Sequence, residues 1–335
     1  MAAACGRRPC NVPPAPMSNA SSASPAAVLP PGTSPGRRRL ERWLDSELIW
    51  PLMVAATVAY LALFIGYPVV YNLVMSFQEV NVGNLRSMNR PFVGLANYIK
   101  LIDDPLFWTV TRNTVFFVVV NVSVQCVGGL LLAMYFAQRF PGAGWLRGLI
   151  LAGWMLPPLV IGAVGKWMLT SDNGIVNHAL QGLGLTNGKI YWLSDPNVAL
   201  ASVTAANIWF GIPFNMILIA AGLAGIPRDI YEAAALDGAG ATRRFFSLTL
   251  PLLAPTLYAL VALTTVYTMR AFDLIWTMTH GGPVDSSNIF PVWSYRLSFE
   301  VFDFGAGAAI STAMLFIVFL VALVYVRSVR AEKRF

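Results

Sequence analysis

The order of apolar and polar positions divides the chain into a polar first segment followed by six long apolar runs. Each run is long enough to cross a bilayer, which takes about 20 apolar residues in a helix. The runs are Leu48–Phe77, Thr114–Gln138, Leu149–Thr170, Val198–Leu223, Leu252–Met278 and Phe304–Val326. The sequence therefore predicts an all-α integral membrane protein with six transmembrane helices in a domain over residues 45–335.

Two of the runs contain helix breakers. Pro157 and Pro158 interrupt the third run, and Gly211 to Pro213 interrupt the fourth. Broken helices inside a membrane face protein or a water-filled cavity, where the freed backbone groups find partners. The sequence thus predicts two interrupted spans that face protein or a water-filled cavity.

Composition agrees with a membrane protein and sets the first segment apart. Of the 335 residues, 56% are hydrophobic and 12% are charged, whereas about 25% are charged in soluble domains. Residues 1–44 are predicted to form a disordered cytoplasmic tail, because positions 1–36 are rich in Ala, Pro, Ser and Gly. Met17 is an alternative start. No signal peptide is visible, since the first apolar run is too long for one.

The basic residues predict the orientation in the membrane. If the N-terminus is cytoplasmic, 15 of the 23 Lys and Arg residues lie in cytoplasmic segments and 6 in outer loops, with Lys166 and Arg270 inside the runs. Positive charge collects on the cytoplasmic side, so both termini and the polar segment 225–251 are expected there. We therefore attribute the +7 net charge to topology and expect no nucleic-acid partner. The outer loops are expected to be locally ordered and to dock an extracytoplasmic partner.

Metal and disulfide chemistry is not indicated. Cys126 lies in an apolar run, whereas Cys5 and Cys10 lie in the first segment. His178 and His280 are far apart in the sequence. These positions fit neither a disulfide framework nor a zinc site.

The polar segment between the fourth and fifth runs carries the strongest signal. Pro227 suits the first position of a helix, and Asp229 and Glu232 place carboxylates near its positive end. Small residues follow, and Gly238 permits a turn. A second short helix is predicted from Arg243, before the chain returns to the bilayer. Such a segment is suited to receive a push from a soluble partner.

This segment resembles the EAA loop of bacterial ABC-importer permeases, in which EAA is followed at fixed spacing by Gly, an aliphatic residue and Leu-Pro. The matching residues are Glu232, Ala233, Ala234, Gly238, Leu248, Leu250 and Pro251. Leu248 stands where Ile is usual. The resemblance extends over residues 45–335 and implies the type I ABC importer permease fold in the cytoplasmic membrane.

The resemblance also implies partners and an ATPase-coupling site. It implies a second permease subunit, two ATP-binding subunits and an extracytoplasmic substrate-binding protein. The coupling residues are Glu232, Ala233, Ala234, Asp237, Gly238, Leu250 and Pro251. The resemblance implies that Glu232 contacts a basic group of the ATPase and that Gly238 determines the shape of the turn. No catalytic residue or cofactor is expected on this chain, and ATP and Mg are expected on the partner ATPase.

A nucleotide site on this chain is not supported by the Gly-Lys pair within the third run, Gly165-Lys166. A phosphate-binding loop requires Gly five residues earlier and Ser or Thr next, but Val160 and Trp167 stand there. Lys166 is instead expected to reach the outer interface of the membrane.

Looser motifs favour a sugar as the substrate. Tyr67-Pro68, the stretch 92–98, Asp273 and the stretch 279–283 look like carbohydrate permeases of the maltose-importer kind. Glycerol 3-phosphate or another polyol is the alternative. A phosphate ester requires more basic residues than the single Arg270 within the fifth run, which favours a neutral sugar.

Polar residues inside the runs are candidates for the substrate pathway, because such groups usually face a cavity or the bundle interior. The candidates are Asn207, Trp209, Asn215, Tyr267, Arg270 and Asp273. The alternative is helix–helix hydrogen bonding, with an internal ion pair between Arg270 and Asp273 on one helix face.

Two other classes of membrane protein have requirements that this sequence does not meet. An ion-coupled secondary transporter or channel requires a path of acidic residues in the membrane or inverted repeats, and Asp273 is the single candidate. A membrane-embedded enzyme requires a catalytic cluster, and no such cluster is visible in the runs.

Overall fold

The structure is a computed structural model that describes residues 49–87, 89–138 and 140–332. The chain divides into two units, 1–64 and 65–335. In the first unit the described part is helix α2 (Ile49–Leu61) and the start of π-helix η1 (Ala62–Gly66), which runs across the boundary. The segment 1–44, predicted to be a disordered cytoplasmic tail, lies outside the described residues.

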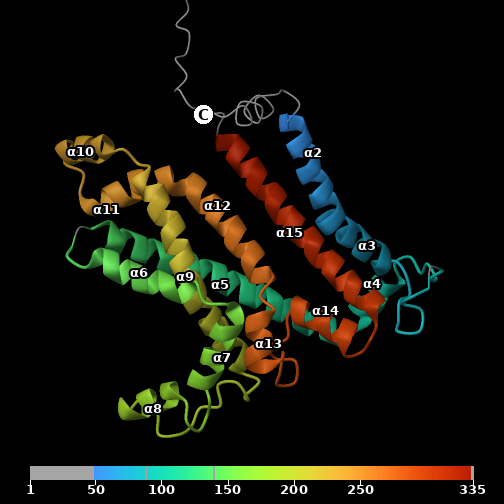
Figure 1. Cartoon of the computed structure of the whole chain (residues 1–335). Coiled ribbons are helices and arrows are strands. Elements are labelled where there is room, and N and C mark those ends of the chain that lie inside the picture. The colour runs from blue at the N-terminus through green and yellow to red at the C-terminus, as the bar shows by residue number, and fades with distance from the viewer. Residues whose placement is uncertain (1–48, 88, 139, 333–335) are drawn as a thin grey trace, which may run out of the picture. The chain divides into compact units, whose positions relative to one another are not determined.

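The described part of the second unit consists of helices, their connecting loops and two isolated β-bridges (Figure 1). Its helices are α3 (Tyr67–Ser76), α4 (Ala96–Asp103), α5 (Pro105–Ala137), α6 (Ala143–Trp154), α7 (Pro158–Met168), α8 (Ile175–Gly182), α9 (Ala199–Ala224), α10 (Arg228–Leu236), α11 (Ala241–Arg244), π-helix η2 (Phe245–Thr249), α12 (Leu250–Met269), α13 (Asp273–Thr279), α14 (Phe290–Phe299) and α15 (Phe304–Glu332).

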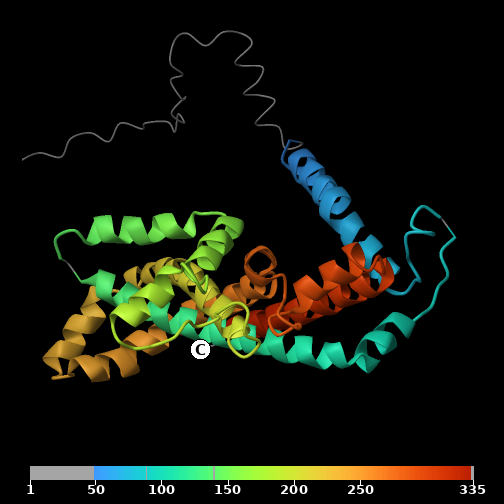
Figure 2. The same cartoon turned by 90° about the horizontal axis from the view of Figure 1, so that it is seen from below.

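The predicted transmembrane helices are confirmed in length and apolar character. Five stretches of the described chain qualify, and a bent pair of helices brings the number to 6. The five are Ile49–Ser76, Pro105–Ala137, Ala199–Ala224, Ala241–Met269 and Phe304–Arg327. The pair is α6 and α7, which meet at an angle of 95° (Figure 2). This bend confirms the break predicted at Pro157 and Pro158.

The break predicted in the fourth span is wrong. Helix α9 continues through Gly211 and Pro213. A Cβ at Gly211 would lie 2.3 Å from Cδ of Gln125 on α5, so this glycine makes room for a neighbouring side chain. Pro213 is buried. It removes one backbone hydrogen bond from the helix, but the helix continues past it.

The fifth span ends earlier than predicted. Helix α12 stops at Met269, and α13 begins at Asp273 after a short break. The N–H groups of Arg270 and Ala271 donate to the carbonyls three residues before them, at Tyr267 and Thr268. These bonds tighten the last turn, as is common where a helix ends.

Close contact between α5 and α9 forms the centre of the unit. A Cβ at Gly129 of α5 would lie 2.6 Å from Cβ of Asn215 on α9, so the absence of a side chain lets the two helices touch. Helix α12 packs on both. The buried apolar residues Ala133, Met216, Ile219, Leu253 and Leu260 fill the space among the three helices.

Polar contacts order the predicted outer loops, which include residues 77–95 and 280–289, as the sequence predicted. Asn113 of α5 donates hydrogen bonds to the carbonyls of Asp285 and Asn288, 3.0 and 3.1 Å away. Asp285 pairs with Arg296 of α14. The two β-bridges join Gln78 to Phe92 and Asn81 to Asp303. The loops are therefore tied to the helices and to each other.

Candidate functional site

Helices α10 and α11 form a helical hairpin outside the packed spans (Figure 1). Pro227 precedes α10 with an extended backbone, so the helix begins at Arg228, one residue later than predicted. Leu236 is the last residue of α10, Asp237 is its C-cap, and Gly238 follows with φ +74°. The N–H groups of Gly238 and Ala239 donate to the carbonyls of Ala235 and Ala234, at 3.1 and 2.9 Å. These two bonds define a Schellman turn, in which glycine is the favoured residue.

The surface of α10 is free of contact with the rest of the described chain over most of its length. Glu232, Ala233 and Asp237 are exposed, whereas Ala234 is half-buried. Leu236 is 91% exposed. Glu232 and Leu236 are four residues apart, so they share one side of the helix. The hairpin thus presents Glu232, Ala233 and Leu236 together.

The hairpin is joined directly to the fifth span. Oη of Tyr231 and Oγ1 of Thr249 lie 3.0 Å apart in a hydrogen bond, and Thr249 is 7% exposed. Thr249 ends η2, and α12 follows without a break. The predicted site residues Leu250 and Pro251 therefore lie at the start of α12 rather than on the hairpin. This contact links α10 to the base of α12.

A buried polar network joins the three central helices. Asn207 of α9 donates to Oδ1 of Asn121 on α5 at 2.7 Å, and Gln125 donates to the Asn207 carbonyl at 3.0 Å. Thr264 of α12 donates to Oδ1 of Asn215 at 3.1 Å. Asn215 in turn donates to the Gly211 carbonyl and to Gln125. The network satisfies polar groups that are costly to leave unpaired in a membrane.

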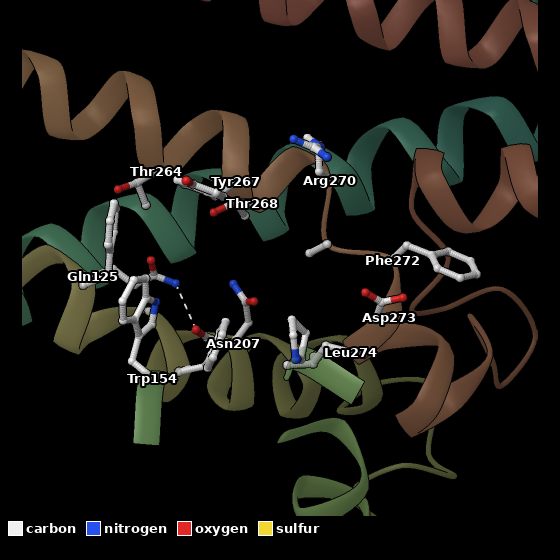
Figure 3. Close-up of a pocket in the computed structure, with 15 residues that line it drawn as sticks. Gln125, Trp154, Asn207, Thr264, Tyr267, Thr268, Arg270, Phe272, Asp273 and Leu274 are labelled. Atoms are coloured by element: carbon white, nitrogen blue, oxygen red, sulfur yellow. Dashed lines mark hydrogen bonds between the residues drawn. The ribbon is translucent and has the colours of Figure 1, made fainter. Parts of the chain in front are cut away.

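One end of this network opens on a cavity of about 260 Å³ between α5, α6, α9, α12 and α13. Figure 3 shows Gln125, Trp154 and Asn207 on one side and Thr264 and Tyr267 on the other. Trp154 stacks on Phe214, with ring centroids 5.3 Å apart, and Phe214 meets Tyr267 edge to face at 5.5 Å. Amides and hydroxyls thus stand beside aromatic rings along the cavity wall.

The two charged residues of the cavity stand at its other end (Figure 3). Arg270 follows the last residue of α12, and Asp273 starts α13. The prediction that they share one helix face is wrong because the helix is broken between them. Among the residues that the structure describes, neither forms an ion pair. Both side chains are exposed and available to a ligand.

The structure separates the six predicted pathway residues into three groups. Asn207, Tyr267, Arg270 and Asp273 line the cavity. Asn215 is fully buried in the network, so it supports the wall. Trp209 lines a different, apolar cavity of about 450 Å³ beside α7.

Sequence reasoning missed Trp154, Phe214 and Thr264 as cavity residues. Trp154 lies just before the Pro157-Pro158 break, so its position beside a broken span was the available signal. Phe214 and Thr264 carried no comparable signal, because aromatic and hydroxyl residues are common in membrane helices. In the described parts of the chain, no group of three or more His, Cys, Asp or Glu side chains is placed to hold a metal ion.

Helices that span the membrane around a cavity with amide and hydroxyl groups in its wall, and an exposed hairpin between the fourth and fifth spans, define a membrane-embedded permease. The fold matches the crystal structure of a bacterial ABC transporter involved in the import of the acidic polysaccharide alginate. The TM-score is 0.74 at 18% identity, over 88% of this chain and 99% of that one. The fold is the type I ABC importer permease fold that the sequence predicted.

The chain belongs to the family of binding-protein-dependent transport system inner membrane components, whose family model matches residues 126–334. It is 34% identical to the sulfoquinovosyl glycerol transport system permease protein SmoG of Agrobacterium fabrum, over 88% of this chain and 95% of that protein. It is 35% identical to the trehalose/maltose transport system permease protein MalF of Thermococcus litoralis, over 71% and 80%. The chain is therefore a multi-pass inner membrane permease of an ABC importer.

Proposed function

We propose that this permease carries a carbohydrate across the inner membrane and that the cavity between α9 and α12 lies on its path. The names of several relatives support the substrate class, since they include permeases for trehalose/maltose, diacetylchitobiose and lactose. The observation that carries the proposal is the cavity wall itself. Trp154 and Tyr267 offer aromatic faces for the C–H side of a sugar ring, and Gln125 and Asn207 lie beside them with amide groups.

The charges of the cavity favour a neutral sugar over glycerol 3-phosphate. Among the described residues of the lining, Arg270 is the one basic residue and Asp273 the one acidic residue, so their formal charges cancel. A dianionic phosphate ester is better matched by several cations converging on one point. Uptake that is competed by neutral disaccharides and not by glycerol 3-phosphate supports this choice, and the reverse order of competition contradicts it.

The hairpin of α10 and α11 is proposed to seat in a partner ATPase. Its exposed Glu232, Ala233 and Leu236 support this docking because they leave one side of α10 uncovered by the rest of the described chain. The ATPase binds ATP and Mg, and this chain binds neither. A second permease completes the pathway, and an extracytoplasmic binding protein delivers the sugar. The bias of Lys and Arg supports cytoplasmic termini and a cytoplasmic hairpin.

Charge reversal on the hairpin tests the coupling role. Glu232→Lys and Gly238→Asp should abolish ATP-driven uptake while the permease still inserts at normal levels. The first change replaces the carboxylate of the exposed face, and the second places a side chain at φ +74°. Glu79→Lys, which reverses an exposed carboxylate outside the hairpin, is the matched control. Undiminished uptake in both hairpin variants would end the proposal.

Two tryptophans test the position of the pathway. Trp154→Leu should lower the maximal uptake rate at saturating binding protein, because Trp154 lines the same cavity as Gln125 and Asn207. Trp209→Leu removes the same side chain from the apolar cavity and should leave uptake near the wild-type rate. A larger loss for Trp209→Leu would move the pathway to the other side of α9. ATP-independent uptake by the lone chain would instead favour a secondary transporter.

A further inference from the structure

Helix α4 has three distinct sides, although it is only 8 residues long. Successive residues turn by about 100° around a helix, so residues spaced by three or four share a side. Leu95, just before the helix, shares one side with Ile99 and Ile102. Lys100 and Asp103 project in a neighbouring direction. The remaining side carries buried residues.

The buried side fixes α4 to the permease. Asn97 donates hydrogen bonds of 2.9 Å to the carbonyls of Ser76 and Gln78, and the hydroxyl of Tyr98 donates to Oγ of Ser76 at 2.8 Å. Leu101 is 7% exposed within an apolar cluster that includes Ala306 of α15. Ser76 is the last residue of α3. The helix is thereby anchored at the end of the first span.

The other two sides differ in character. Leu95, Ile99 and Ile102 are 61, 58 and 49% exposed and form a continuous apolar strip. Lys100 lies on the polar side, where its Nζ is 2.9 Å from Oδ2 of Asp303. Asp103 is also exposed. A helix with one protein side, one apolar side and one charged side suits the line where protein, lipid and water meet.

The neighbouring span ends place α4 at that depth. The apolar part of α15, Phe304–Arg327, has 24 residues, which at 1.5 Å each give about 36 Å. The hydrocarbon core is about 30 Å thick. If the apolar part of α15 is centred in the bilayer, each of its ends lies roughly 3 Å outside this core. Asp303 immediately precedes α15 and pairs with Lys100 of α4. Helix α5 begins two residues after α4 ends, and its Trp108 is 62% exposed, as expected of a residue near the interface.

We propose that α4 is an interfacial membrane helix, with Leu95, Ile99 and Ile102 inserted at the boundary between lipid headgroups and acyl chains. Lys100 and Asp103 face the water, and Asn97 and Leu101 hold the helix to the bundle. The occupant of the apolar strip is lipid. A protein partner on the strip is the competing outcome.

Spin labels on the assembled transporter distinguish these outcomes. Single cysteines replace Ile99, Ile102 and, as the matched control on the same helix, Asp103, in a full-length chain whose three native cysteines are changed to serine. Each labelled complex is reconstituted in phospholipid nanodiscs. Collision with oxygen, which concentrates in lipid, is compared with collision with a water-soluble nickel chelate.

The labels at 99 and 102 are expected to collide several-fold more with oxygen than with the nickel chelate, and the label at 103 to show the reverse. Strong collision with the chelate at 99 and 102 would place the strip in water and overturn the proposal. Protection from both reagents at 99 and 102 would show that a protein covers the strip, which also overturns it. Uptake by each labelled complex confirms that it is assembled.

Discussion

The hydrogen bond between Tyr231 and Thr249 offers a sharp test of how movement of the hairpin reaches the membrane. Tyr231→Phe removes one hydroxyl and retains the ring. Thr249 is then left with its 3.4 Å contact to the Arg244 carbonyl in a site that is 7% exposed. A hydrogen bond of this kind contributes about 1 kcal/mol, which corresponds to about a fivefold shift between attached and detached arrangements of α10, since 1.4 kcal/mol is tenfold.

The assay is the number of sugar molecules imported per ATP hydrolysed by the complete transporter in proteoliposomes. Tyr231→Phe and Thr249→Val should each lower this ratio, because hydrolysis continues while less of the movement reaches α12. The double variant should be little worse than either single one, because both remove the same bond. Tyr258→Phe is the control, since this exposed tyrosine of α12 forms no side-chain hydrogen bond in the described structure.

Additive losses in the double variant would refute this reasoning. They would show that the two hydroxyls act through separate contacts. An unchanged ratio in both single variants would show that α10 moves α12 through the backbone alone.

Three further predictions concern stability. Gly129→Ala should destabilise the permease by about 1–3 kcal/mol, because the added Cβ would be 2.6 Å from Cβ of Asn215 on α9. Gly148→Ala, whose added Cβ would have no atom within 4 Å, should leave the Tm in detergent unchanged. Equal Tm values for the two variants would contradict this prediction. Gly238→Ala should cost about 1–2 kcal/mol at φ +74°, and an unchanged Tm would argue against strain there. Lys189 lowers the pKa of the Asp172 carboxyl by hydrogen bonding and by its charge. The Asp172 carboxylate therefore stabilises the folded protein at pH values above its unfolded pKa of about 4. This stabilisation is lost as the pH falls through the lowered pKa. Asp172→Asn should therefore lower the Tm slightly at pH 7 and not in acid, and a pH-independent difference would exclude the ion pair.

The spans were predictable because crossing a bilayer requires long apolar runs. The bend between α6 and α7 was also predictable, since Pro157 and Pro158 disfavour a continuous helix. The end of α12 was not predictable in the same way. The apolar run continues to Met278, and the break after Met269 contains neither glycine nor proline. Hydropathy does not register such a break.

The candidate site was predicted unevenly for a similar reason. The hairpin was placed from Glu232 and Gly238 because local spacing and turn chemistry determine its shape. The cavity depends on which helices meet, and α5, α9 and α12 are far apart in the sequence. Asn207 and Asn215 lie eight residues apart on one helix, yet one lines the cavity and the other is sealed behind it. Their different roles follow from packing against Gln125 and Thr264.

The continuity from α11 through η2 into α12 has a mechanical consequence. Helix α12 alone has 20 residues, or about 30 Å, with the hairpin joined to its base and Thr264 and Tyr267 near its tip. Used as a lever, a helix of this length turns a tilt of about 5° at the base into a travel of about 3 Å at the tip. A swing of that size is enough to widen or close a sugar-sized opening.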